Sequence, residues 1–320
     1  MPSLPWPLDP ARLHTRDEQA VGRALLATPL RVVDGKPAPG LCTLDLRCGR
    51  WTKAVLAQLR RAGIQRTDRW RLTSVRAAPR AAPGPFRLVR GSADGIVARR
   101  GTTTLIFVRM SPRAAVAAFR AGRVDEAPVP YGDIRALRGD PALRVRQILA
   151  LDLVKLDPRI PVAVRRVYWQ TADRADYQAL VPEYAARPAL GLVPDADPAR
   201  TSPSLYRAAR SAVGRLPHLA VRIAAPPELR DPAEIVASNW AELGLGPIVG
   251  AAGPSRFLRV QAEYPHPGAV EQQLGIADPV AYAQALVVPL AWVADARLVS
   301  PRLRGWAEDA LGVPDYTRVK

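Results

Sequence analysis

The segment Leu219–Val249, which reads LAVRIAAPPELRDPAEIVASNWAELGLGPIV, decides the fold class of this 320-residue chain. Leu219–Ala224 and Ile248–Val249 are short β-rich runs, and Pro232–Leu243 between them has a helical pattern of apolar residues. A strand, a helix and a second strand at this spacing form a βαβ unit with parallel strands. The segment therefore predicts an α/β fold.

The helix within this segment has recognisable ends. Asp231 followed by Glu234 predicts a capping box at its start, and Gly244 predicts its end. Its apolar side is expected to hold the residues Ile235, Val236, Trp240 and Leu243.

Similar signals predict two more helices nearer the N-terminus. Thr15 and Glu18 are spaced as a capping box, and the apolar side of the helix that they open carries Val21, Leu25 and Leu26. Ser111 followed by proline predicts an N-cap, and Gly122 predicts the end of that helix.

Strand patterns surround these helices. Three runs separated by Gly or Ser turns predict a small antiparallel sheet: Phe86–Arg90, Gly95–Arg99 and Thr104–Met110. Leu286–Val293 and Ala296–Val299 predict a further pair of strands. Strands that pair in both senses predict mixed sheets.

The charge balance is strongly basic, with 46 Lys plus Arg against 29 Asp plus Glu. Nucleic-acid binding is one interpretation of such an excess, and an arginine-rich genomic composition is the other. Nucleic-acid binders concentrate their charge on one face or tail, whereas the arginines here extend from Arg12 to Arg318. The pattern favours the compositional interpretation, and nucleic acid is not expected as a partner.

Motifs for catalysis and metal binding are missing from the sequence. His14, His218 and His266 are far apart, and no P-loop, GxSxG, HExxH or GxGxxG occurs. Cys42 and Cys48 match neither a redox motif nor a zinc half-site; they are either a small disulfide loop or two free thiols. We therefore expect no enzyme, no metal and no cofactor.

Targeting signals are also missing. No apolar run approaches the roughly 18 residues of a membrane-spanning helix. The first residues, MPSLPW, show no basic segment followed by an apolar one, so no signal peptide is visible.

Four groups of motifs follow one another along the chain. They are LDPAR (Leu8–Arg12) with VDGKPAP (Val33–Pro39), GPFRLV (Gly84–Val89) with FRAGRVDEA (Phe119–Ala127), VAVRRVYWQTAD (Val162–Asp173), and VPLAW (Val288–Trp292) with RLVSPRLRGW (Arg297–Trp306). In this order they resemble the family 5 extracellular solute-binding proteins, the peptide-capturing subunits of bacterial ABC importers. The chain resembles a shortened member, with reduced stretches at Leu41–Ala82 and Gly268–Leu286.

The resemblance implies a two-lobed periplasmic-binding-protein-like fold of type II, with mixed sheets and reduced size. Lobe I is expected to comprise residues 1–151 together with 289–320, and lobe II residues 152–288. The chain is expected to cross between the lobes at Asp152–Pro158 and at Val288–Trp292, and to close on ligand by a hinge motion.

The resemblance also implies a ligand site. QAEYPHP (Gln261–Pro267) is similar to the family's WGADYPDP loop, whose Asp pairs with the peptide's α-ammonium group, and Glu263 stands at that Asp position. Val260 replaces the family's usual Trp. Further candidate ligand contacts are Tyr264 beside Glu263, Trp292 at the second crossing, and Tyr168 or Trp169 on the Val162–Asp173 helix. Tyr168 and Trp169 occupy neighbouring helix faces, so at most one is expected to face the cleft.

The function implied by the resemblance is capture of peptides or similar amine-bearing solutes for an ABC importer. The expected partners are such a solute and the permease subunits, and the expected location is periplasmic or extracellular. Contact with a membrane would then occur through the permease or a lipid anchor. Two alternatives stay open, a basic nucleic-acid-binding or interaction protein and a degenerate, non-transporting relative.

Overall fold

The structure is a computed structural model that describes residues 1, 15–25, 84–181, 185–216, 221–262, 268–309 and 311–320. It also gives the backbone of four short strands, β1 (Arg31–Val33), β2 (Lys36–Ala38), β3 (Ile64–Arg66) and β4 (Leu72–Ser74), paired as β1–β2 and β3–β4. Cys42, Cys48, His14, His218 and His266 lie outside the described residues.

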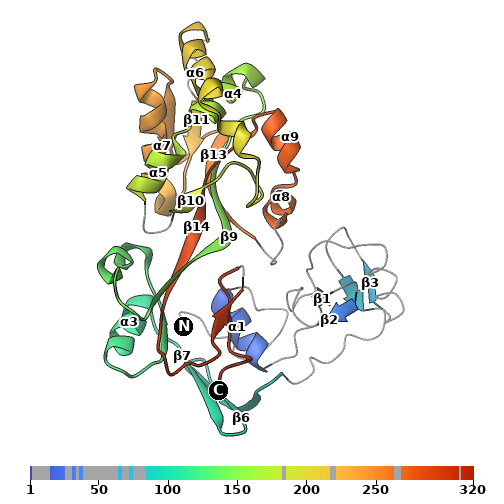
Figure 1. Ribbon diagram of the computed structural model, residues 1–320, viewed down its shortest axis with the longest axis vertical. Coiled ribbons are helices and arrows are strands. Elements are labelled where there is room, and N and C mark those ends of the chain that lie inside the picture. Colours follow the sequence, from blue (N-terminus) through green and yellow to red (C-terminus); the bar gives the residue numbers. More distant parts are fainter. Residues whose placement is uncertain are drawn as a thin grey trace. The chain divides into compact units, whose positions relative to one another are not determined.

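The described chain divides into two compact units, shown in Figure 1. Unit 1 takes its described residues from Met1–Arg146 and Asp295–Lys320, and unit 2 from Gln147–Ala262 and Pro267–Ala294. The lobe boundaries expected from the resemblance, 151/152 and 288/289, stay a proposal.

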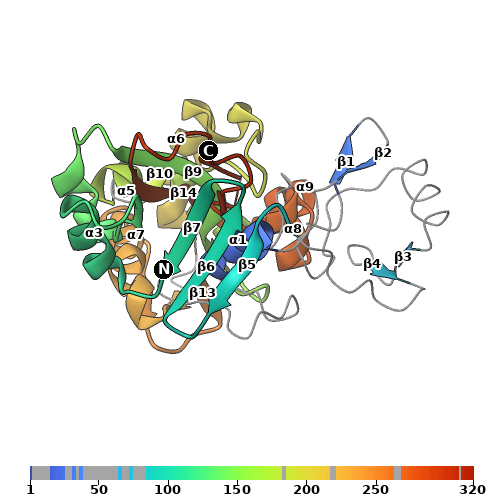
Figure 2. The same cartoon turned by 90° about the horizontal axis from the view of Figure 1, so that it is seen from below.

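Unit 1 contains an antiparallel sheet of β5 (Arg87–Gly91), β6 (Gly95–Arg100) and β7 (Thr103–Val108). This sheet confirms the three predicted strands. Helix α1 (Arg16–Leu25) lies along it (Figure 2), and α3 (Pro112–Arg120) precedes β8 (Glu126–Pro128). Further elements of unit 1 are η2 (Tyr131–Asp133), η3 (Arg135–Leu137), β15 (Ala307–Glu308) and β16 (Pro314–Asp315).

Both predicted N-terminal caps of unit 1 are confirmed. Thr15 N–H donates to Glu18 at 2.9 Å, and Glu18 N–H donates to the Thr15 hydroxyl at 3.2 Å. Ser111 accepts a hydrogen bond from Ala114 N–H, and Gly122 follows α3 with a φ of +68°.

Unit 2 is built on strands in the order β10-β14-β9-β13-β11-β12. These strands are β9 (Leu143–Lys155), β10 (Ala185–Pro188), β11 (Val221–Ala224), β12 (Pro247–Gly250), β13 (Ser255–Gln261) and β14 (Val287–Val299). The first residues of β9 and the last residues of β14 belong to unit 1, where β14 pairs with β8. The sheet is mixed, because β11 runs parallel to β12 and β13 whereas β13 runs antiparallel to β9.

Helices α4 (Val162–Thr171), α5 (Arg174–Leu180), α6 (Pro203–Ala212), α7 (Arg230–Glu242), α8 (Ala269–Leu274) and α9 (Asp278–Ala283) also belong to unit 2. Short 3₁₀ turns flank two of them: η4 (Pro198–Thr201) precedes α6, η5 (Val213–Arg215) follows α6, and η6 (Pro227–Leu229) precedes α7. The predicted βαβ unit is confirmed as β11-α7-β12, with Ile223 beside Val249 in a parallel pair.

Two predictions about these elements are wrong. Helix α7 begins at Arg230 with Leu229 as N-cap and no side-chain cap, because η6 runs directly into it, so Asp231–Glu234 is not a capping box. The predicted strand pair at 286–299 is one strand, β14. Asp295 interrupts its apolar run, but this carboxylate is paired with Arg16 at 2.8 Å and the strand continues without a turn.

Arginine side chains connect loops and helix ends by donating hydrogen bonds to backbone carbonyl oxygens. Arg165 is 4% exposed and donates to the carbonyls of Pro158, Ile160 and Gln284 at 2.6–3.0 Å. Arg100 in the same way reaches the carbonyls of Thr317 and Val319. Buried backbone acceptors need such donors, so these arginines stabilise segments that lack regular pairing.

Candidate ligand-binding site

The loop whose Glu263 carboxylate is predicted to bind the ligand's ammonium group, with Tyr264 beside it, lies outside the described residues. The residues just before this loop are well defined. Ala262, directly after β13, is 4% exposed and donates its N–H to the Leu149 carbonyl of β9 at 2.7 Å. Val260, at the position of the family's Trp, is 7% exposed and lies opposite Leu151. The sheet therefore fixes the residue that immediately precedes Glu263.

The chain is fixed again just after this loop. The Gly268 carbonyl accepts the Gln272 N–H at 3.2 Å, and Ala269 and Val270 at the start of α8 are fully buried. Glu271 accepts a hydrogen bond from the backbone N–H of Asp278, which connects α8 to α9. Both flanks of the predicted ligand loop are thus anchored by packed, hydrogen-bonded residues.

Asp278 connects this region to the segment around Gly191. Its carboxylate accepts the Leu192 N–H at 2.6 Å and pairs with Arg200 at 2.7 Å. A Cβ atom on Gly191 would lie 2.5 Å from Asp278 Oδ1 and 2.7 Å from Arg200 Nη1. The ion pair therefore packs against a position that has room for glycine alone.

Replacing Gly191 with Ala is expected to lower the free energy of unfolding by about 1–3 kcal/mol, the usual cost of forcing an extra methyl into a packed site. Urea unfolding measures this change. Gly246→Ala is the matched control, since a Cβ atom there meets nothing within 4 Å, and it should stay within about 1 kcal/mol of the parent chain. Equal stability of both variants would contradict the packing argument.

A buried ion pair lies on β9 and β13, a few residues before the ligand loop. Arg259 faces Asp152 across the two strands, with Nε–Oδ1 and Nη2–Oδ2 distances of 2.7 and 2.8 Å. The Tyr177 hydroxyl also donates to Asp152, which is fully buried. Bidentate pairing of this kind fixes strand register. Sequence reasoning missed it because Asp152 and Arg259 are 107 residues apart.

Three of the four predicted aromatic contacts, Tyr168, Trp169 and Trp292, are buried. Tyr168 packs edge-on against Trp240 with ring centres 4.8 Å apart, and Trp169 packs against Tyr282 at 4.9 Å. Tyr168, Trp169 and Trp292 are each 1% exposed. Helix α4 buries both faces that carry Tyr168 and Trp169, so these rings contribute to the core of unit 2. Ligand contact by any of them stays a prediction.

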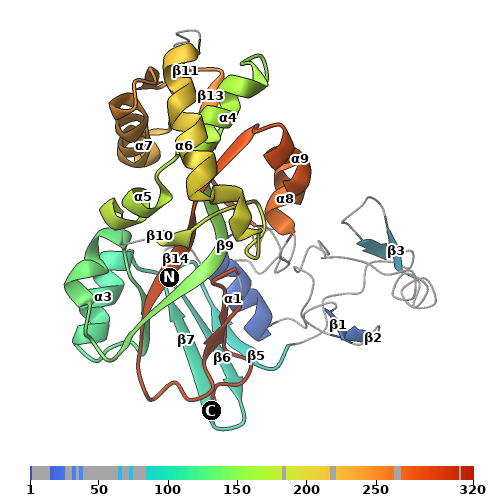
Figure 3. The same ribbon diagram turned by 45° about the horizontal axis from the view of Figure 1, so that its top comes forward.

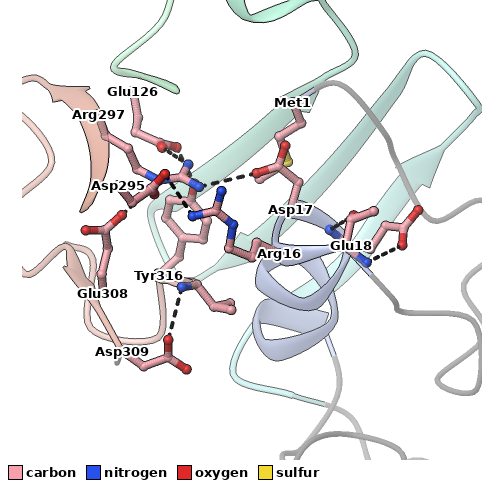
Figure 4. Close-up of polar contacts among 12 residues, drawn as sticks. Met1, Arg16, Asp17, Glu18, Glu126, Asp295, Arg297, Glu308, Asp309 and Tyr316 are labelled. Carbon is pink, nitrogen blue, oxygen red and sulfur yellow. Dashed lines mark hydrogen bonds and ion pairs between the residues drawn. The ribbon is translucent and has the colours of Figure 1, made fainter. Parts of the chain in front are cut away.

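Unit 1 contains a buried charge cluster centred on Arg297, shown in Figure 4. The guanidinium is 3% exposed and lies 2.8 Å from Glu308, 3.3 Å from Asp295 and 3.5 Å from Asp17. It also pairs with Glu126, which accepts a hydrogen bond from the Tyr316 hydroxyl. One arginine therefore forms ion pairs with four carboxylates that come from distant parts of the sequence.

Burial and pairing compete within this cluster. Burial lowers the pKa of Arg297, but the carboxylates of Glu126, Asp295 and Asp17 outweigh it and hold that pKa well above its ordinary value. Burial raises the pKa of Glu308 to about 7, with Arg297 opposing the shift. Glu308 Oε1 is ion-paired with Arg297 but accepts no hydrogen bond. The effect of burial on the pKa of Glu308 therefore exceeds the opposing effect of Arg297.

The raised pKa of Glu308 gives a pH prediction. In the folded state Glu308 stays protonated from its ordinary pKa of 4.5 up to about pH 7, whereas in the unfolded state it loses the proton near pH 4.5. The contribution of Glu308 to stability is therefore full below pH 4.5 and is lost as pH rises through about 7. Compared with the parent chain, Glu308→Gln should gain about 2–3 kcal/mol of unfolding free energy between roughly pH 5 and pH 8. Urea unfolding at both values tests this.

Glu242→Gln, a change on the exposed end of α7, serves as the control for this titration. Removing an exposed charge there should change the free energy of unfolding by less than about 1 kcal/mol. A pH-independent difference between Glu308→Gln and the parent would contradict the prediction. Burial also raises the pKa of Asp17, and Glu308→Gln leaves that contribution in place, so the comparison isolates Glu308.

Two other kinds of feature are absent from the described residues. No group of three or more His, Cys, Asp or Glu side chains among them is arranged to hold a metal ion. No helix among them has the length and apolarity needed to cross a membrane.

The chain matches no protein-family model and no curated protein sequence. Solved structures do match. The unliganded open form of the periplasmic murein tripeptide-binding protein MppA aligns at 13% identity over 97% of this chain and 94% of that one, with a TM-score of 0.67. The clavulanic acid biosynthesis oligopeptide-binding protein 2 aligns at 17% identity over 97% and 92%, with a TM-score of 0.63.

A third match is NikA from Brucella suis in complex with Fe(III)-EDTA, at 14% identity over 100% of this chain and 98% of that one, with a TM-score of 0.62. Identities this low concern the fold alone. They confirm the resemblance predicted from the sequence motifs, and with it the two-lobed periplasmic-binding-protein-like fold with mixed sheets.

Proposed function

We propose that this chain, which has the fold of periplasmic solute-binding proteins, is the substrate-binding component of an ABC importer. Its ligands would be peptides or similar amine-bearing solutes, bound in a cleft between two lobes. The full-length fold match to proteins described as tripeptide- and oligopeptide-binding carries the proposal. Its partners would be permease subunits, and its location periplasmic or extracellular.

Glu263 is proposed to bind the ligand's ammonium group. The support comes from the two flanks of its loop, because Ala262 and Ala269 are held by hydrogen bonds and burial in unit 2. A carboxylate on a loop with fixed ends can be pre-organised for a charge-assisted hydrogen bond, which is stronger than a neutral one. Tyr264, Trp292 and either Tyr168 or Trp169 would form the walls.

The proposed lobes are residues 1–151 with 289–320 and residues 152–288. Two long strands, β9 and β14, each contribute residues to both compact units and give this division physical support. Ligand binding would then close the lobes by bending where these strands pass between them.

Isothermal titration of the full chain against di- and oligopeptides tests the proposal. Peptides with a free N-terminus should bind with negative heat-capacity change, as expected for burial of apolar surface in a closed cleft. Absence of saturable binding at millimolar peptide would refute the proposal.

A further inference from the structure

Unit 2 contains a cavity of about 500 Å³ formed by the end of α4, the start of α5, the end of β10, and η4 with the start of α6. Helices α4 and α6, which both contribute lining residues, lie side by side (Figure 3). Its lining residues are Gln170, Ala172, Asp173, Arg174, Ala175, Pro188, Leu190, Thr201, Pro203, Tyr206 and Arg207. Cavities of this size accommodate small organic ligands. None of the residues proposed to bind peptide is among the lining residues.

Gln170 is one of the lining residues, and its side chain carries an unsatisfied polar group. The residue is 6% exposed, and its amide oxygen is buried without a hydrogen-bond partner. A buried acceptor left unpaired costs about 1–3 kcal/mol, so such groups are rare in native proteins and each calls for an explanation. A ligand with an N–H or O–H group in the cavity would satisfy it once the Gln170 amide turned toward that ligand.

Arg174 gives the same wall a buried positive charge. Its side chain donates to the backbone carbonyls of Ala172, Trp169, Ala189 and Pro289 and lies 4.5 Å from the centre of the Trp169 ring. In the described part of the chain, no carboxylate forms an ion pair with it. Burial lowers its pKa to about 10, with Asp173 opposing the shift, and the group is still charged at neutral pH.

Charge around the cavity favours an anion. Two arginines, Arg174 and Arg207, face one carboxylate, Asp173, which leaves one net positive charge on the lining. The Asp173 side chain already accepts the Asp176 N–H as the N-cap of α5. Arg207 is exposed on the first turns of α6 and can move toward a ligand.

We propose that this cavity is a binding site for a small monocarboxylate that has an apolar body and one hydrogen-bond donor. The ligand carboxylate would form an ion pair with Arg207 and would also be attracted by the buried charge of Arg174. The ligand's hydrogen-bond donor would donate to the amide oxygen of Gln170. The apolar body would lie on Pro188, Leu190 and Pro203. This second site goes beyond peptide capture and lies entirely within unit 2.

Titration of the full chain with 4-hydroxybenzoate tests the proposal by calorimetry. This probe combines a carboxylate, an apolar ring and one hydroxyl donor. Binding should saturate in the millimolar range or below. 4-Hydroxybenzamide, which lacks the charge, should bind about tenfold more weakly, and benzoate, which lacks the donor, severalfold more weakly.

Two variants and one control locate the binding. Arg207→Gln should weaken 4-hydroxybenzoate binding about tenfold, whereas Arg210→Gln, on the same exposed helix but outside the cavity, should leave it unchanged. Gln170→Leu should make 4-hydroxybenzoate and benzoate bind equally, because the acceptor for the hydroxyl has been removed.

A further variant separates this site from the proposed peptide site. Glu263→Gln should leave 4-hydroxybenzoate binding unchanged, so the two proposals can fail independently. The cavity proposal is overturned by any of three results: no saturation at millimolar probe, equal effects of Arg207→Gln and Arg210→Gln, or loss of probe binding in Glu263→Gln.

Discussion

Glu263→Gln is expected to lower affinity for peptides with a free N-terminus by about tenfold to a hundredfold, the range for loss of a charge-assisted hydrogen bond. The amide keeps the size of the side chain but removes the negative charge that would face the ligand ammonium. Calorimetric titration of parent and variant with the same tripeptide measures the change.

Chemical controls on both partners make this test specific. N-acetylation of the peptide should weaken binding to the parent chain but not to Glu263→Gln, because the charge pair is already gone. Glu263→Asp introduces the residue that the resembled solute-binding proteins have in this loop, and it should retain most of the affinity. Glu242→Gln should bind as the parent does. If N-acetylation weakened binding to both proteins equally, Glu263 would not be the ammonium partner.

Arg297→Met is expected to destabilise unit 1 strongly, with a loss of about 3–5 kcal/mol of unfolding free energy. The variant leaves the carboxylates of Asp17, Glu126, Asp295 and Glu308 without their shared cation. Buried charges that lose their partner keep the desolvation cost and lose the compensating attraction. Urea unfolding near neutral pH measures the loss.

The loss should become smaller at acidic pH, because protonation removes the repulsion among the four carboxylates. Arg302→Met provides the matched control. Arg302 pairs with Asp125 at 3.1 Å, but the two side chains are 69% and 46% exposed, and exposed pairs contribute about 0–1 kcal/mol. Comparable losses in both variants, or no change with pH, would contradict a desolvated cluster at Arg297.

Local signals in the sequence predicted the elements well. The Thr15–Glu18 and Ser111 caps depend on hydrogen bonds between residues three apart, so the residues that decide each structure lie within one turn. The β11-α7-β12 unit was predictable for a related reason, because its apolar helix face and flanking strands form one continuous segment.

Contacts over long sequence separation were not predictable. From the sequence, Asp295 and Arg297 indicate an interruption of an apolar strand. Their ion-pair partners Arg16 and Glu126 are far away in the sequence, so no local pattern indicates the pairing. The predicted aromatic contacts show the same difficulty. Tyr168 and Trp169 have the chemistry of ligand walls, yet Trp240 and Tyr282 supply equally good partners inside unit 2.

The arginines that bind backbone carbonyls have a consequence for how the formal charge of +17 should be understood. A carbonyl oxygen accepts a hydrogen bond without neutralising the cation, so Arg165 and Arg174 each add to the positive excess while their side chains are withdrawn from solvent. Part of the positive charge of this protein therefore lies on buried arginines that hold the backbone in place. Counting arginines overstates the positive potential that a polyanion approaching from solution would meet.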